Sequence, residues 1–249
     1  IRPAGDGAEA AARALDTELN RIYLDPVVHG RYPADARAEM LPPPALIRDG
    51  DMAVLGAPID FLGVNYYTPL YVRPGNWSDL RRGEAPLPGH PGIVSYRPPE
   101  LPRTTTDWLV EPDGLYDVLM RLRADTGGLP LYVTENGCAA DDYVDPSGQI
   151  NDFERVLYVH GHLAAAWRAI RDGANLAGYF HWSLMDNFEW ALGYRRRFGL
   201  YFVDFGTQRR LPKRSAAFYS VIARSNALPT LDGVATAPAS DARAAASGG

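Results

Sequence analysis

Short apolar runs alternate with helix-like stretches along this chain, and that alternation restricts the possible folds more than any other feature. Four runs have the length and composition of β-strands: residues 61–67, 131–134, 177–182 and 198–203. Apolar residues at helical spacing predict helices over residues 115–122, 152–172 and 213–224, and each of these is bounded by Pro or Gly. Apolar strands separated by helices indicate an α/β fold with a parallel sheet covered by helices.

The remaining segments show weaker patterns. Residues 8–24 have helical spacing, and Asp25-Pro26 is expected to end that helix. Residues 68–111 are rich in Pro, Gly and Arg with little periodicity, which predicts a long loop at the mouth of a site. The Ala, Ser and Gly composition of residues 229–249 predicts a disordered tail. We therefore expect one domain over residues 1–228, followed by that tail.

Composition excludes several classes of protein. The 249 residues are 46% hydrophobic and 22% charged, which suits one globular domain with a sizeable core. A net charge of -5 argues against a nucleic-acid partner. The single cysteine, Cys138, permits no internal disulfide. No apolar run approaches the roughly 18 residues of a membrane span, and no signal-peptide pattern is seen, so we predict a cytoplasmic protein. A single cysteine also gives no metal-ligand cysteine spacing, and we expect neither a metal nor a cofactor.

Two segments place reactive groups at strand ends. Residues 132–137, Y-V-T-E-N-G, put the carboxylate of Glu135 at the end of an apolar run, directly before turn residues. Residues 178–190, G-Y-F-H-W-S-L-M-D-N-F-E-W, end in two tryptophans, two acids and an asparagine. Taken alone, these patterns also fit a loop carboxylate and core aromatics. Carboxylates beside indole faces favour a sugar-binding site.

Together these motifs resemble the retaining β-glycosidases of glycoside hydrolase family 1, which carry T-E-N-G and W-S-L-x-D-N-F-E-W motifs. The runs F-L-G-V-N-Y-Y and R-F-G-L-Y-F-V-D extend the resemblance, which covers about residues 10–224. It implies the C-terminal half of a (β/α)8 TIM barrel, with the fifth to eighth strand–helix units. It also implies hydrolysis of terminal β-linked sugars, with a β-glycoside as the substrate.

The resemblance implies a role for each site residue. Glu135 corresponds to the catalytic nucleophile, and Tyr67 to the hydroxyl donor that keeps it ionised and oriented. Glu189 corresponds to the acceptor of hydrogen bonds from the sugar 4- and 6-hydroxyls. The full sugar-binding set comprises Asn65, Trp182, Glu189, Trp190 and Phe198.

The sequence lacks the motifs that the family carries on its earlier strands, including those with a Gln, a His, a Trp and an Arg. Family members carry their acid/base glutamate in an N-E-P motif, and no Asn-Glu-Pro occurs in this chain. Three hypotheses follow: a truncated or split β-glucosidase that needs its N-terminal half, a non-catalytic carbohydrate-binding half-barrel, or a self-complementing dimer of two half-barrels. The expected partners are therefore the missing half or a second copy.

Overall fold

The computed structural model describes residues 1–231, which form two compact units. The first unit comprises residues 1–60, 69–101 and 125–127, and the second comprises residues 61–68, 102–124 and the described residues from 128 to 231. The predicted tail lies outside the described residues, except for residues 229–231. Within the described part, no helix is long and apolar enough to cross a membrane.

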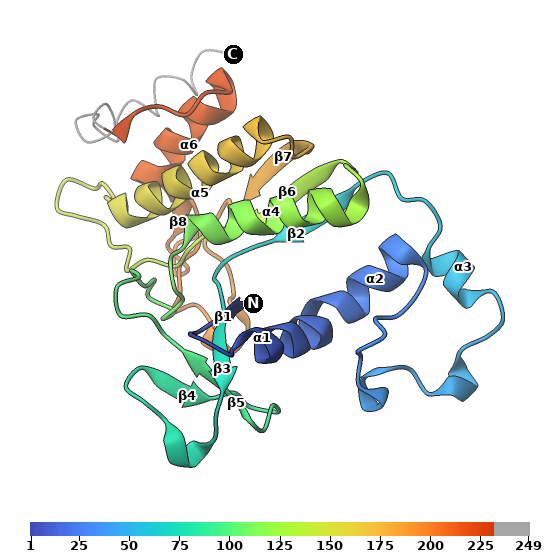
Figure 1. Cartoon of the computed structure of the whole chain (residues 1–249). Coiled ribbons are helices and arrows are strands. Elements are labelled where there is room, and N and C mark those ends of the chain that lie inside the picture. Colours follow the sequence, from blue (N-terminus) through green and yellow to red (C-terminus); the bar gives the residue numbers. More distant parts are fainter. Residues whose placement is uncertain (232–249) are drawn as a thin grey trace. The chain divides into compact units, whose positions relative to one another are not determined.

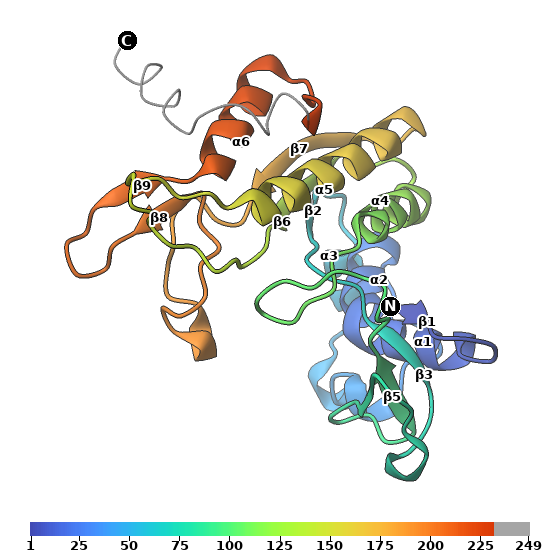
Figure 2. The same cartoon turned by 90° about the vertical axis from the view of Figure 1, so that its left-hand side faces the viewer.

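A parallel sheet with strand order β2-β6-β7 is the base of the second unit (Figure 1). Its strands are β2 (Leu62–Asn65), β6 (Leu131–Asn136) and β7 (Leu176–His181). Its helices are α4 (Pro112–Thr126), α5 (Phe153–Arg171) and α6 (Arg214–Ser225). Two views at right angles show α4 and α5 running alongside the strands (Figures 1 and 2). The predicted α/β class and parallel pairing are confirmed.

Local sequence explains where these elements begin and end. Leu131 and Val133 of β6 are 0% exposed, as expected for a strand covered by helices. Proline at the first position of α4 loses no helical hydrogen bond, and Gly127 ends the helix at a φ of 66°, which favours glycine. Helices α5 and α6 share an apolar cluster that includes Val156 and Phe218.

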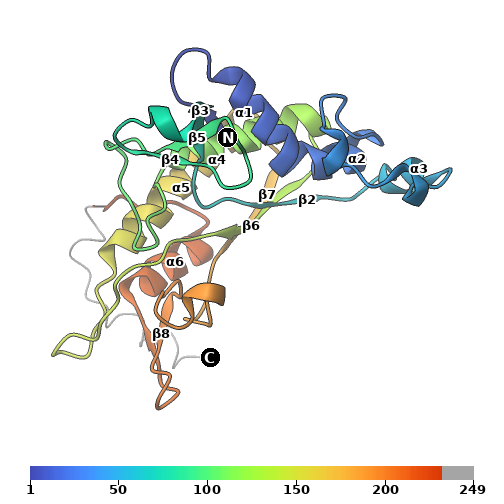
Figure 3. The ribbon, with the colours of Figure 1, turned by 90° about the horizontal axis from the view of Figure 1, so that it is seen from below.

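The fourth predicted strand does not join this sheet. β8 (Tyr201–Val203) pairs antiparallel with β9 (Arg210–Pro212) in a separate two-stranded sheet. The reason is that the chain continues past β7, and residues 198–201 bond to that extension: the amide of Tyr201 donates to the carbonyl of Leu184 at 2.9 Å. Figure 3 accordingly shows β8 apart from β7.

The predicted N-terminal helix is longer than expected. It comprises α1 (Glu9–Asp16), a π-helical turn (Thr17–Arg21) and α2 (Ile22–His29). Pro26 lies inside α2 and does not end it. The helix ends instead at Gly30, whose φ of 63° is the left-handed conformation that glycine adopts readily. A short helix, α3 (Asp51–Leu55), follows.

The predicted long loop contains a sheet. Three strands lie in it: β3 (Tyr71–Pro74), β4 (Glu84–Pro86) and β5 (Ile93–Tyr96). β1 (Arg2–Pro3), from the start of the chain, joins them in a sheet with the order β1-β3-β5-β4. These strands have two to four residues, too few to show a period in the sequence. Val72 is 0% exposed and packs with Ala12 and Leu15 of α1. The expectation of an irregular loop was therefore wrong for residues 71–96.

Candidate active site

Strand pairing brings Asn65 and Glu135 opposite each other at the ends of β2 and β6. Leu62 pairs with Leu131 and Val64 with Val133, but an irregularity between Val64 and Asn65 shifts the register so that Asn65 pairs with Glu135. Such bulges re-aim side chains and are frequent beside active sites. The carboxyl ends of parallel strands are also where barrel enzymes hold their catalytic groups.

Glu135 has a direct partner in Tyr67. The Tyr67 hydroxyl donates to Glu135 Oε2 at 2.7 Å, and the amide of Tyr66 donates to the carbonyl of Glu135 at 3.0 Å. Burial, followed by the hydrogen bond to Glu135 and its charge, raises the pKa of Tyr67 above the ordinary value for tyrosine. The phenol thus stays protonated at neutral pH and donates to the carboxylate.

A buried asparagine connects the strands behind this pair. Asn136 is 0% exposed. Its Nδ2 donates to the carbonyl of Tyr66 at 2.7 Å and to the hydroxyl of Tyr158 at 3.1 Å, and its Oδ1 accepts from Tyr179 at 2.6 Å. The Tyr158 hydroxyl then donates to the carbonyl of Tyr67 at 3.0 Å. Asn136 therefore couples the Tyr67 segment to β6, a role that its place in T-E-N-G did not reveal.

Glu189 is electrostatically coupled to Glu135. Burial raises the pKa of Glu189, the side-chain hydrogen bond with Trp182 lowers it, and the charge of Glu135 raises it. Trp182 directly follows β7, and its amide donates to the carbonyl of Asn136 at 3.0 Å. The segment after β7 thus carries a second carboxylate, that of Glu189, which interacts electrostatically with Glu135, and the indole of Trp182. This pairing suits a polar ligand with apolar faces.

The other predicted residues differ in their surroundings. Phe198 is 1% exposed and packs edge-on against Tyr67, with ring centroids 6.3 Å apart. Trp190 begins a 3-10 turn (Trp190–Leu192) and is 80% exposed. Asn65 is exposed, and its Oδ1 accepts from Thr134 at 2.7 Å. The structure therefore groups Tyr67, Glu135 and Phe198 by direct contact, while Trp190 projects outward.

The sequence analysis missed Trp108. Its ring lies 5.3 Å from that of Tyr67 and 5.8 Å from that of Phe198. Trp108 precedes α4 within the predicted loop, where no motif identified it. The rings of Trp108 and Phe198 therefore both pack against Tyr67, which restricts the orientation of its phenol.

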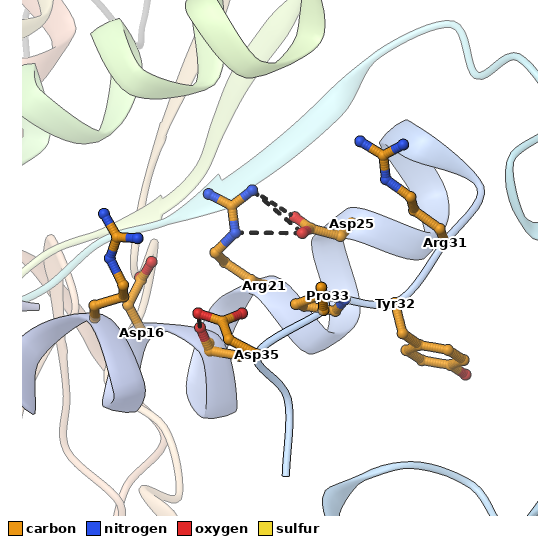
Figure 4. A pocket seen from close by; sticks show the side chains of 10 residues that line it. Asp16, Arg21, Asp25, Arg31, Tyr32, Pro33 and Asp35 are labelled. Carbon is orange, nitrogen blue, oxygen red and sulfur yellow. Dashed lines mark hydrogen bonds and ion pairs between the residues drawn. The ribbon is translucent and has the colours of Figure 1, made fainter. Parts of the chain in front are cut away.

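A separate cavity of about 910 Å³ lies within the first unit (Figure 4). Mainly charged and polar side chains from α1, the π-helical turn, α2 and the following loop line it, and several of them are hydrogen-bonded to one another. Arg21 Nη2 donates to Asp25 Oδ2 at 3.2 Å, and Thr17 donates to Asp35 at 3.3 Å. None of the predicted site residues lines it, so we place the candidate active site at the strand ends.

Comparisons with known proteins point to one family. The sequence model of Glycosyl hydrolase family 1 matches residues 2–228. The bifunctional β-D-glucosidase/β-D-fucosidase of Bifidobacterium breve is 39% identical over 220 residues, which cover 86% of this chain and 48% of that protein. Thermostable β-glucosidase B of Thermobispora bispora is 40% identical over 224 residues, covering 89% of this chain and 45% of that protein.

Solved structures give the same result. The β-glucosidase from Thermotoga maritima in complex with azafagomine superimposes with a TM-score of 0.79 at 35% identity, covering 92% of this chain and 49% of that chain. The chain thus spans about half the length of the curated relatives it matches.

Proposed function

The chain belongs to glycosyl hydrolase family 1, and on that premise we propose that it carries the nucleophile and the sugar-binding side of a retaining β-glycosidase. The hydrogen bond between Tyr67 and Glu135 is the observation that carries this proposal. The proposed substrate is a terminal β-linked sugar of the glucoside type. The relatives named as β-glucosidases support this substrate class.

The proposed chemistry has two steps. The carboxylate of Glu135 attacks the anomeric carbon, the bond to the leaving oxygen breaks, and an acid protonates that oxygen. Water then attacks the glycosyl ester on Glu135 and releases the sugar with its original anomeric configuration. Tyr67 orients Glu135 and stabilises its charge between turnovers.

Sugar recognition is assigned to the segments around Glu135. Glu189 accepts hydrogen bonds from the 4- and 6-hydroxyls, and its raised pKa reflects a partly desolvated carboxylate. Trp182 and Trp190 pack on the ring, while Asn65 and Phe198 line the pocket. Buried hydrogen bonds to a charged acceptor are worth about 1.5–3 kcal/mol each.

The second carboxyl group of the reaction comes from outside these segments in our proposal. We assign the chain to the fifth to eighth strand–helix units of a (β/α)8 barrel, and the remaining units to another polypeptide segment or to a second copy of this chain. Among the described strands, β2 pairs only with β6, so its other edge is available to a further strand.

An activated substrate tests the nucleophile without the acid. We propose a dinitrophenyl β-glucoside with fluorine in place of its 2-hydroxyl, because dinitrophenolate leaves without a proton and the fluorine slows hydrolysis of the glycosyl ester. Mass spectrometry should find one fluoroglucosyl group on the peptide that contains Glu135. Glu135→Gln should abolish this labelling.

Glu154→Gln is the matched control, because Glu154 is an exposed glutamate in the first turn of α5. This variant should label at the wild-type rate. Absence of labelling both in the wild-type chain alone and after addition of a polypeptide with the first half of a relative, with reversible glucoside binding retained, would favour the non-catalytic carbohydrate-binding half-barrel. Labelling of another carboxylate would refute the assignment of Glu135.

A further inference from the structure

Six charged side chains are buried together in the second unit, and we call them the buried charge cluster. Its three carboxylates and three cations cancel in formal charge: Asp142, Asp152, Asp186, Arg155, Arg197 and Lys213. Most of these side chains are 0% or 1% exposed, and the most exposed, Arg197, is 20% exposed. Burying so many charges is unfavourable unless each one keeps its partners.

Lys213 joins the two segments that carry the candidate site residues. Its Nζ donates to Asp142 Oδ2 at 2.6 Å and to Asp186 Oδ1 at 2.7 Å. Asp142 lies between β6 and α5, in the segment that follows Glu135. Asp186 lies after β7, in the segment that ends at Glu189. One ammonium group therefore bonds a carboxylate from each segment.

Both carboxylates are fixed by further bonds. Asp142 accepts from Arg155 Nη2 at 2.7 Å, and Arg155 Nε also donates to the carbonyl of Cys138 at 3.3 Å. Asp186 accepts from the amide of Gly199 at 3.0 Å. Movement of Lys213 would therefore displace the two loops that carry Asp142 and Asp186, and not only their side chains.

We infer that Lys213 is a positioning residue, which holds the Trp182–Glu189 segment in a set position relative to the segment that follows Glu135. Lys213 touches neither the sugar nor the reacting atoms, and it acts through Asp186. The part of this inference that concerns sugar binding rests on the proposed function. The part that concerns the position of Trp182 does not.

The first test observes Trp182 directly. Trp182 directly follows β7, and its amide donates to the carbonyl of Asn136 at 3.0 Å. The signal of its indole N–H in a nitrogen-15 NMR spectrum therefore reports the position of this segment. Lys213→Met removes the ammonium and keeps most of the side-chain volume. We expect the Trp182 indole signal, assigned with Trp182→Phe, to shift and its hydrogen exchange to accelerate, while the signal of Trp167 on α5 stays in place.

A double variant separates positioning from charge balance. Lys213→Met leaves one excess negative charge in the cluster, and adding Asp142→Asn removes it without restoring the bond between the two segments. We expect the double variant to regain much of the lost thermal stability while the Trp182 signal stays shifted. If Lys213→Met does not fold, the double variant carries the test. Return of the Trp182 signal to its wild-type position in the double variant would refute the inference.

Fluoroglucoside labelling adds the functional readout. Lys213→Met should weaken reversible binding of the fluoroglucoside roughly tenfold, about the effect of one lost hydrogen bond, with a smaller change in the rate of labelling at saturation. Wild-type chain that is labelled neither alone nor with the first half of a relative added would refute the proposed function, and the NMR test would still decide the role of Lys213.

Val156→Ala provides the stability control, because Val156 is 0% exposed in the apolar cluster between α5 and α6, among apolar side chains. We expect it to lower the thermal midpoint without shifting the Trp182 signal or weakening fluoroglucoside binding. Equal effects of Val156→Ala and Lys213→Met on both readouts would show that Lys213 only stabilises the fold.

Discussion

Tyr67 shows how much a single side chain contributes to the candidate site. Its hydroxyl is the donor to Glu135 Oε2, and its ring packs against Trp108 and Phe198. The resemblance of the N-Y-Y run to the family predicted Tyr67 as this donor. The aromatic packing that orients the Tyr67 phenol depends on Trp108, which lies 41 positions later in the sequence.

Tyr67→Phe should slow labelling of Glu135 by the activated fluoroglucoside roughly 10- to 100-fold, the loss expected for one charge-assisted hydrogen bond. The phenyl ring keeps the packing against Phe198, so the thermal midpoint should change little. The measurement is the labelling rate at saturating fluoroglucoside. An unchanged rate would mean that Tyr67 does not stabilise Glu135.

His162 predicts a pH dependence of stability. It is 0% exposed on α5 and stacks on Tyr158, and burial lowers its pKa from 6.5 to about 4. Between these values the unfolded chain binds a proton that the folded chain does not, so this stability is present above pH 6.5 and is lost as the pH falls towards 4.

The loss attributable to His162 is on the order of 3 kcal/mol. Urea unfolding at a series of pH values measures it. His162→Phe should reduce the slope of unfolding free energy against pH within this window. Parallel curves for the two proteins would show that His162 is not the group responsible.

At the scale of elements, the close approach of β6 to the chain after β7 depends on Gly137. A Cβ atom there would lie 1.9 Å from the carbonyl oxygen of Trp182, which is backbone and has little freedom to move. The glycine of T-E-N-G is therefore required by packing between two strand ends. This requirement involves residues far apart in the sequence.

Gly137→Ala should destabilise the protein by about 1–3 kcal/mol, the usual cost of overpacking, and should disturb the Trp182 indole signal. Chemical unfolding and the NMR spectrum are the measurements. Gly206→Ala is the control, because a Cβ atom at Gly206 would meet only Asp204 Oδ1 at 3.4 Å, an ordinary contact. Equal destabilisation by both substitutions would contradict the packing argument.

At the scale of the whole molecule, the sheet of the second unit has an open edge at β2. An edge strand with unpaired backbone groups recruits a further strand, and β2 pairs only with β6 within the described residues. We propose that this edge receives the rest of the barrel, supplied either by a segment with the remaining units or by a second copy of the chain.

The isolated chain should therefore associate with itself in solution. Light scattering after size-exclusion chromatography at several concentrations measures the mass. Addition of a polypeptide that carries the first half of a relative should replace self-association and raise turnover of unactivated glucosides. A monomer at all concentrations with full turnover alone would show that the chain needs no further strands.

The sequence by itself predicted β2, β6, β7 and the helices α4, α5 and α6, because each has an apolar pattern bounded by Pro or Gly within a few residues. It also predicted Glu135 and Tyr67 through their motifs. Only the tertiary structure placed Asn65 opposite Glu135, turned β8 away from the sheet, formed strands within residues 71–96 and joined Lys213 to two carboxylates. These features depend on contacts between distant residues, which local patterns of hydrophobicity and turn chemistry do not encode.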